Sequence, residues 1–180
     1  RPPTAQWTAT AAGCTLLADD GPGPYVSHIT CGKIVDWGMS DANNMGAAMA
    51  PAAYEALAAF LRDTGTTPRD YDLIITGDLG ELGHAIVRDL FAGDGVELGE
   101  NFQDCGMLLY DRQRQDMHAG ASGCGCSAAV LNGYLLSELR RGTWKSILFA
   151  PTGALLSPTS SFQGESIPGI CHVVHLTVNK

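Results

Sequence analysis

The 180-residue sequence has few positive charges, few aromatic residues and no long hydrophobic run. Its 11 Lys and Arg stand against 19 Asp and Glu, which gives a formal net charge of -8. Sequence-independent binding to nucleic acid depends on Lys and Arg that neutralise phosphates, so we expect no nucleic-acid partner. No apolar run approaches the ~20 residues of a membrane-spanning helix, and no apolar signal core follows Arg1. We therefore expect a soluble chain without an export signal.

The cysteines lack the spacing of a structural metal site. No C-x-x-C pair occurs, and the two sulfurs of a Cys-Gly-Cys run are too close in sequence for the usual zinc knuckle. Without a secretory context, an even number of cysteines does not indicate disulfides. We expect no metal and reduced thiols at all six positions: Cys14, Cys31, Cys105, Cys124, Cys126 and Cys171.

What the sequence does have is enough apolar material for one core. Hydrophobic residues make up 45% of the chain and charged residues only 17%. This balance can offset the entropy of ordering the chain, and it argues against intrinsic disorder.

One segment predicts a strand, a tight turn and a helix in succession. Residues Leu73 to Thr76 are four β-formers without alternation, typical of a strand buried on both faces of a parallel sheet. The turn Gly77 to Gly80 follows, and the spacing of apolar residues predicts a helix from Glu81 to Phe91 that Gly93 stops. This order is a βα unit.

The remaining elements complete an α/β pattern, whose crossovers should be right-handed. Pro51 suits the first turn of a helix, because its missing N–H costs nothing there. We expect a loop over 36–50 and an unpatterned segment over 155–169. The other predicted strands are Trp7–Leu17, Tyr25–Val35, Met107–Tyr110, Ser146–Ala150 and Ile170–Val178, and the other predicted helices are Pro51–Arg62 and Cys124–Arg141.

Three segments resemble the superfamily of thiolases and ketoacyl synthases. They are MGAAMAPAA at 45–53, YDLIITGD at 71–78 and SGCGCSAA at 122–129. The resemblance implies an α/β, thiolase-like fold, in which the chain forms one half-domain: a mixed five-stranded sheet flanked by helices.

Further segments are similar to the C-terminal half of a spore protein of that superfamily. They include RPPTAQWT, DCGMLLYD, TGALLSPTS and ESIP. This likeness implies that residues 1–20 hold the last strand of an N-terminal half and that residues 21–180 form the C-terminal half. It also implies a non-catalytic protein, without a cofactor, that binds dipicolinic acid (pyridine-2,6-dicarboxylate), alone or as its Ca²⁺ chelate, for uptake into the developing spore.

The same likeness implies a location and partners. The protein would lie peripherally at the spore inner membrane, and otherwise in the cytoplasm of the forespore or mother cell. Its partners would be other sporulation proteins and a second copy of itself.

The sequence departs from the enzymes at their catalytic positions. Gly77 and Asp78 stand where a ketoacyl synthase has a histidine, and Ser122 stands near the histidine position of thiolases. A general base must lie within hydrogen-bond reach of the proton it moves, and Gly offers none. Two other functions stay open: an acyltransferase that uses Cys171 and His172, and a structural subunit of a membrane complex.

Candidate ligand-binding residues lie in three loops: Thr76–Gly80, Ser122–Ser127 and Gly164–His172. The carboxyl ends of strands are the general ligand position in open α/β sheets, and we expect the loops to converge there. None of the three loops contains Lys or Arg, so helix N-termini or residues of the other half would supply the positive potential. The candidates are Asp78, Ser122, Cys124, Cys126, Ser127, Cys171 and His172.

Each candidate also has a structural interpretation. The start of the predicted helix at Cys124 and Cys126 should attract anions and lower a thiol pKa, or these small residues allow tight packing. Asp78 either orients a ligand or caps the following helix, and we favour the cap. His172 donates to a carboxylate, pairs with the Cys171 thiol, or is a satisfied core histidine.

Overall fold

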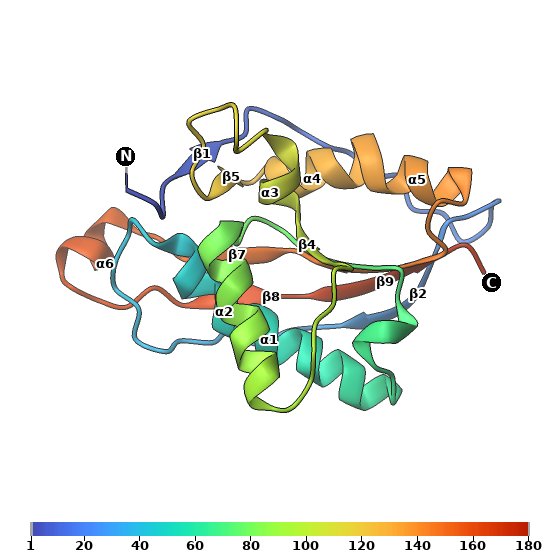
Figure 1. Cartoon of the computed structure of the whole chain (residues 1–180), viewed down its shortest axis with the longest axis horizontal. Coiled ribbons are helices and arrows are strands. Elements are labelled where there is room, and N and C mark those ends of the chain that lie inside the picture. The colour runs from blue at the N-terminus through green and yellow to red at the C-terminus, as the bar shows by residue number, and fades with distance from the viewer. Residues whose placement is uncertain (1, 180) are drawn as a thin grey trace.

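A mixed five-stranded sheet lies at the centre of the computed structural model, which describes residues 2–179 (Figure 1). Its spatial order is β2 (Tyr25–Thr30), β9 (Val173–Thr177), β6 (Ser146–Ala150), β3 (Leu73–Thr76) and β4 (Phe102–Asp104). β3 pairs in parallel with β4 and β6, whereas β9 runs antiparallel to β6 and β2. The predicted α/β class and mixed five-stranded sheet flanked by helices are confirmed.

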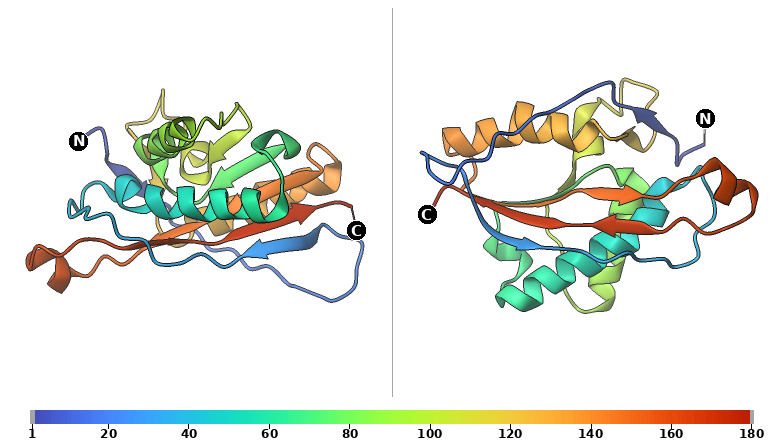
Figure 2. Two further views of the ribbon diagram at one scale, coloured as in Figure 1. Left: turned by 90° about the horizontal axis from the view of Figure 1, so that it is seen from below. Right: turned by 180° about the vertical axis from the view of Figure 1, so that it is seen from behind.

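Helices cover both faces of this sheet. α1 (Met45–Thr64) and α2 (Gly80–Gly93) lie on one side; the other side carries a helix built from α4 (Cys126–Val130), the π-helical turn η2 (Leu131–Leu135) and α5 (Leu136–Arg141). Figure 2 shows α1 and the α4–α5 helix on opposite sides of the strands. None of the helices within residues 2–179 combines the length and apolarity that crossing a membrane requires.

The side chains of β3 alternate between two hydrophobic cores. Ile74 packs in the core under α1 and α2, and Leu73 and Ile75 pack in the core under α4 and α5. All four residues of β3 are buried. The prediction of a strand buried on both faces is therefore confirmed.

Shorter elements surround the sheet. β1 (Gln6–Thr8) pairs in parallel with β5 (Gly120–Ser122), and β7 (Thr152–Ala154) pairs antiparallel with β8 (Gly169–Cys171). The β7–β8 pair is an arm that ends in α6 (Pro158–Phe162) and reaches beyond the helices (Figures 1 and 2). The remaining elements are the short helix α3 (Cys105–Leu109) and the 3-10 turn η1 (Pro68–Asp70).

The predicted strand Trp7–Leu17 is wrong over most of its length. Only Gln6–Thr8 forms a strand, because only these residues meet a partner strand, at Gly120–Ser122. After Ala9, whose N–H donates to the Ser122 carbonyl, the chain continues without regular structure through a run of exposed residues.

α1 begins at Met45, ahead of the predicted start at Pro51, which lies inside the helix. Asn44 caps it, with Oδ1 accepting from the Ala47 N–H at 3.3 Å. This first part packs closely on α2: a Cβ added to Gly46 would lie 2.2 Å from the Leu79 carbonyl oxygen. Burial of the alanine-rich start offsets the hydrogen bond that Pro51 removes.

The predicted strand Met107–Tyr110 is also wrong. The strand here is β4, Phe102–Asp104, and the chain then turns directly into α3. The Asp104 carboxylate accepts from the Met107 N–H at 3.2 Å, and this cap starts the helix within the apolar run.

Other boundaries differ by a few residues. β2 ends at Thr30 instead of Val35. Val35 forms only an isolated antiparallel bridge with Gly169. The predicted strand Ile170–Val178 divides at His172 into β8 and β9, and the segment 155–169 contains α6. The α4–α5 helix begins at Cys126 instead of Cys124 and ends at Arg141, as predicted; Gly142, with a φ of 79°, is the expected left-handed cap.

Candidate functional site

The carboxyl ends of the parallel strands converge on a set of polar side chains that we call the strand-end cluster. Two of the expected loops meet here, at the end of β3 and at the approach to α4. The cluster consists of Thr76, Asp78, Asp104, Ser122, Cys126 and Thr152.

Asp104, at the end of β4, is fully buried and holds the cluster together. Its carboxylate accepts from Thr76 Oγ1 at 2.7 Å and from the N–H groups of Leu79, Gly80 and Met107 at 2.9, 3.1 and 3.2 Å. One side chain thus caps the starts of α2 and α3. Sequence reasoning missed this residue, although an Asp directly before a helix start is a recognised signal.

Asp78 joins three segments of chain. Its carboxylate accepts from Ser122 Oγ at 3.0 Å, from the Gly123 N–H at 2.9 Å and from Thr152 Oγ1 at 3.4 Å. Burial raises the pKa of Asp78 above 3.8, against the lowering effect of these hydrogen bonds. The predicted cap of α2 by Asp78 is wrong, since Asp104 fills that role and Asp78 instead fixes the loop before α4.

Position 123 must be glycine for its N–H to reach the Asp78 carboxylate. Its φ of 108° lies in the region that favours glycine, and this conformation aims its N–H at Asp78. The glycine-rich approach to α4 is therefore a structural requirement of the cluster.

Cys126 lies buried beneath this loop. Its thiol donates to the Gly77 carbonyl at 3.8 Å, and burial, followed by the charges of Asp78 and Asp104, raises its pKa to about 12. The expected lowering of this pKa by a helix N-terminus is wrong, because burial outweighs any such effect. Cys126 is a protonated thiol at neutral pH.

Cys171 and His172 do not form a thiol–imidazole pair. The buried Cys171 thiol donates to the carbonyls of Ala150 and His172, both at 3.5 Å, and burial raises its pKa to about 12. The exposed His172 ring instead accepts from the Gly32 N–H through Nδ1 at 3.1 Å. His172 is therefore also not the satisfied core histidine that the sequence suggested.

The third loop reaches the cluster only at one end. Cys171 lies opposite Thr152 in the β7–β8 pair, and Thr152 contacts Asp78. The rest of the arm extends away from the sheet towards α6 (Figure 1). Of the other candidates, Cys124 is exposed and Ser127 half-buried at the start of α4.

The cluster is acidic and its carboxylates are occupied by donors. Of its described side chains, two are carboxyl groups and none is Lys, Arg or His. Within residues 2–179 no three His, Cys, Asp or Glu side chains come together as a group that could hold a metal ion. The cluster therefore acts as a rigid joint between loops, in which burial raises the pKa of one carboxyl group, Asp78.

The fold and this joint define an α/β protein whose strand ends are locked by buried carboxylates. The sequence places it in a family: a family model described as Stage V sporulation protein AD (SpoVAD) matches residues 1–177. The chain belongs to that family.

A curated relative supports the assignment. The chain is 41% identical over 174 residues to Stage V sporulation protein AD of Bacillus subtilis (strain 168), a match that covers 97% of the chain and 51% of the relative. The chain thus spans about half the length of that relative.

Two solved structures are more distant. The chain is 17% identical to human mitochondrial 3-ketoacyl-CoA thiolase in complex with CoA, with a TM-score of 0.40 over 83% of this chain and 30% of that one. It is 12% identical to 3-oxoacyl-[acyl-carrier-protein] synthase III from Aquifex aeolicus VF5, with a TM-score of 0.42 over 83% of this chain and 44% of that one. Because these scores are low, the family assignment rests on the sequence matches.

Proposed function

We propose that this sporulation-family chain takes part in binding dipicolinic acid, alone or as its Ca²⁺ chelate, during uptake into the developing spore. The observation that carries the proposal is the 41% identity to Stage V sporulation protein AD along 97% of the chain. The protein acts peripherally at the spore inner membrane, beside other stage V sporulation proteins and a second copy of itself.

We further propose that the chain is non-catalytic. In the strand-end cluster Asp104 accepts four hydrogen bonds, Asp78 accepts three, and the Cys126 thiol is protonated at neutral pH. A nucleophile needs a thiolate or an adjacent base, and a general base needs a free lone pair aimed at substrate. In the cluster the thiol is protonated, and both carboxylates already accept hydrogen bonds from the protein.

The division at residue 20 is part of the proposal. Residues 1–20 belong with a preceding half and residues 21–180 form the C-terminal half. The exposed, apolar course of the chain near Leu16 and Leu17 supports this, because such residues are usually covered.

The ligand is tested by isothermal titration of dipicolinic acid, with and without Ca²⁺, into solutions of this chain and of the full-length protein. Heat of binding in either is the expected result, and absence of binding in both would contradict the proposal. A Cys126→Ala/His172→Ala variant of the full-length protein tests the strand-end loops: unchanged affinity would exclude these two side chains from the site.

One observation favours a structural subunit as the second candidate function. Phe162 is 90% exposed at the tip of the β7–β8 arm, and Leu155 lies exposed on the same arm. An exposed apolar tip on a protruding arm suits a protein contact. Loss of co-purification with partner sporulation proteins in a Phe162→Ser variant, with dipicolinate binding absent throughout, would favour this function.

A further inference from the structure

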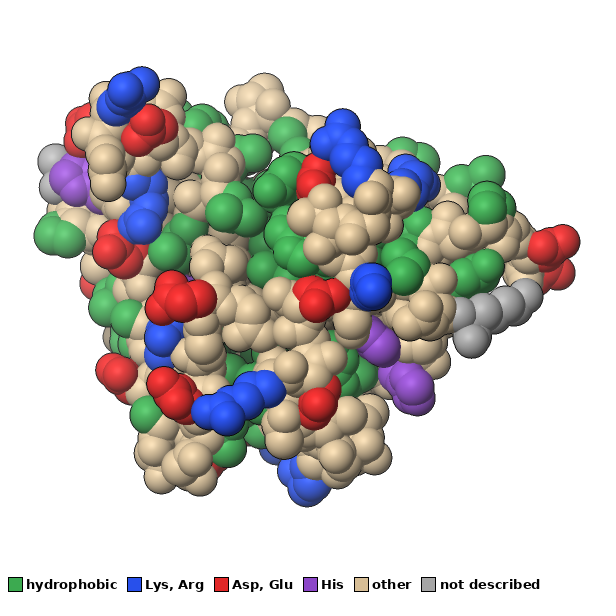
Figure 3. Space-filling model, turned by 45° about the vertical axis from the view of Figure 1, so that its right-hand side comes forward, with side chains coloured by type: hydrophobic (Ala, Val, Ile, Leu, Met, Phe, Trp, Pro, Cys, Tyr) green, Lys and Arg blue, Asp and Glu red, His purple; other side chains and the backbone are tan. Residues whose placement is uncertain are grey.

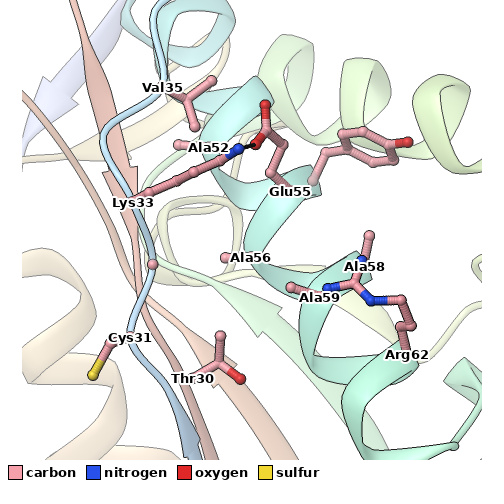
Figure 4. A pocket seen from close by; sticks show the side chains of 12 residues that line it. Thr30, Cys31, Lys33, Val35, Ala52, Glu55, Ala56, Ala58, Ala59 and Arg62 are labelled. Atoms are coloured by element: carbon pink, nitrogen blue, oxygen red, sulfur yellow. Dashed lines mark ion pairs between the residues drawn. The ribbon is translucent and has the colours of Figure 1, made fainter.

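A groove of about 400 Å³ runs between α1 and the extended segment 30–35 (Figure 4). Ala52, Ala56 and Ala59 form much of its α1 wall. Because alanine side chains end at Cβ, the helix leaves a hollow here that larger residues would fill. We call this cavity the α1 groove.

The groove presents cations although the chain as a whole is acidic. Two cationic side chains, Lys33 and Arg62, and one anionic side chain, Glu55, line it, whereas the whole chain carries a formal charge of -8. In Figure 4 Lys33 comes from the extended segment and Arg62 from α1, on opposite walls. The face drawn in Figure 3 mixes acidic and basic side chains. The groove therefore combines an apolar wall with two cations, each paired with one carboxylate, Glu55 or Asp63.

Each cation of the groove is exposed and pairs with one carboxylate; the Glu55 side chain is 26% exposed and the Asp63 side chain 61%. Lys33 Nζ lies 2.6 Å from the Glu55 carboxylate, and Arg62 Nε lies 3.2 Å from the Asp63 carboxylate. The Lys33 and Arg62 side chains are 75% and 70% exposed. Exposed pairs contribute about 0–1 kcal/mol, so a ligand carboxylate can replace either partner at little cost.

We propose that the α1 groove binds a small organic anion that carries one or two carboxylates on a flat apolar body. Lys33 and Arg62 pair with carboxylate oxygens, and the body packs on the alanine wall formed by Ala52, Ala56 and Ala59. The fork of an arginine and the point charge of a lysine are the usual protein partners of carboxylates. The inference rests on the proposed function for the flat body of the ligand and for the choice of dipicolinate as a probe.

Titration with three probes tests the ligand class: dipicolinate, benzoate and pyridine, the last without a carboxylate. The chain should bind the first two and not the third. The double variant Lys33→Met/Arg62→Met keeps the side-chain stems and should weaken carboxylate binding at least tenfold. Its matched control, Lys145→Met/Arg69→Met, removes two exposed cations outside the groove and should bind as the unchanged chain does.

Two further variants separate charge from shape. Glu55→Gln releases Lys33 from its partner and removes a negative charge, so it should tighten carboxylate binding about threefold or more. Ala59→Met fills the half-buried wall with all charges in place and should abolish binding. Thermal melting of each variant checks that the fold is kept.

The outcomes distinguish the groove from the proposed function. Weaker binding in the Lys33/Arg62 and Ala59 variants with a normal melting temperature supports the groove. Unchanged dipicolinate affinity in both would overturn the groove and leave the proposed function standing. If the chain binds benzoate, and neither the chain nor the full-length protein binds dipicolinate, the groove proposal is supported and the proposed function is contradicted. Binding of neither carboxylate by the chain would overturn the groove, and dipicolinate binding by the full-length protein would then still support the function.

Discussion

The strand-end cluster is partly to fully buried and acidic, and its carboxylates accept from protein donors, whereas the α1 groove is open and carries two exposed cations, each paired with a carboxylate. The cluster lies where ligands usually bind in open α/β sheets, at the carboxyl ends of the strands. Position in the sheet is therefore not sufficient for binding an anion. Hydrogen-bonding capacity matters as well: the carboxylates of the cluster already accept from protein donors, whereas the groove presents two exposed cations.

The largest predicted difference concerns thiol reactivity. Cys31 is exposed in the groove, and Cys126 is buried in the cluster with a pKa raised from 9.0 to about 12. At pH 8 this shift alone lowers the thiolate fraction of Cys126 by about a thousandfold. Time-resolved iodoacetamide labelling followed by mass spectrometry should therefore modify Cys31 long before Cys126. Equal rates in the native chain would contradict the burial of the cluster, and in urea the two rates should converge.

The next effect is on stability. Asp104→Ala leaves three N–H groups without their acceptor and removes the closer of the two acceptors of the Thr76 hydroxyl, so we expect a loss of about 3 kcal/mol or more in the free energy of unfolding, measured by urea denaturation. Asp63→Ala, which removes an exposed carboxylate beside the groove, should leave the midpoint nearly unchanged. Similar midpoints for the two variants would show that Asp104 is not the joint described here.

A smaller effect concerns pH. Burial raises the pKa of Asp78 above 3.8, so the folded chain binds this proton more strongly than the unfolded chain does. The stabilisation from this group is fully present below pH 3.8 and is lost as the pH rises through the raised pKa. The unfolding free energy of the unchanged chain, minus that of the Asp78→Asn variant, should therefore become more positive as the pH falls from 7 towards 4. A constant difference would mean that the pKa of Asp78 is not raised.

The smallest expected effect belongs to the groove. Glu55→Gln breaks the ion pair with Lys33, whose side chain is 75% exposed, and should change the unfolding free energy by no more than about 0.5 kcal/mol. Chemical denaturation measures it. A large loss would show that the pair supports the fold, and a ligand could then not exchange into it at little cost.

The sequence predicted elements well where burial leaves a simple pattern. Residues Leu73–Thr76 and Ser146–Ala150 read as strands, because both faces are covered and no polar position interrupts the apolar run. The α2 helix was found from its period and from Gly93. These elements form the centre of the fold.

The sequence failed where a distant partner decides the structure. Trp7–Leu17 has the composition of a strand, but only its first residues meet another strand, at Gly120–Ser122. The apolar run at Met107–Tyr110 resembles a strand until the cap from Asp104 is known. Cys126 at a helix start suggested a lowered pKa, and only the packing beneath Gly77 reveals the burial that raises it.

The groove could not have been predicted from the sequence, because it too depends on residues that are distant along the chain. Lys33 and Arg62 lie in separate elements, and an alanine-rich helix face is usually a packing surface. Only the three-dimensional structure places these cations on opposite walls of one cavity.

The most direct test of the contrast between groove and cluster is a ¹H–¹⁵N NMR titration of the chain with dipicolinate, read amide by amide. We predict that the shifts concentrate at Cys31, Gly32 and Lys33 and along α1 from Ala52 to Arg62, with Leu79, Gly80 and Gly123 unchanged. Shifts centred on Leu79, Gly80 and Gly123, with the groove amides unchanged, would contradict this account and return the ligand to the strand ends.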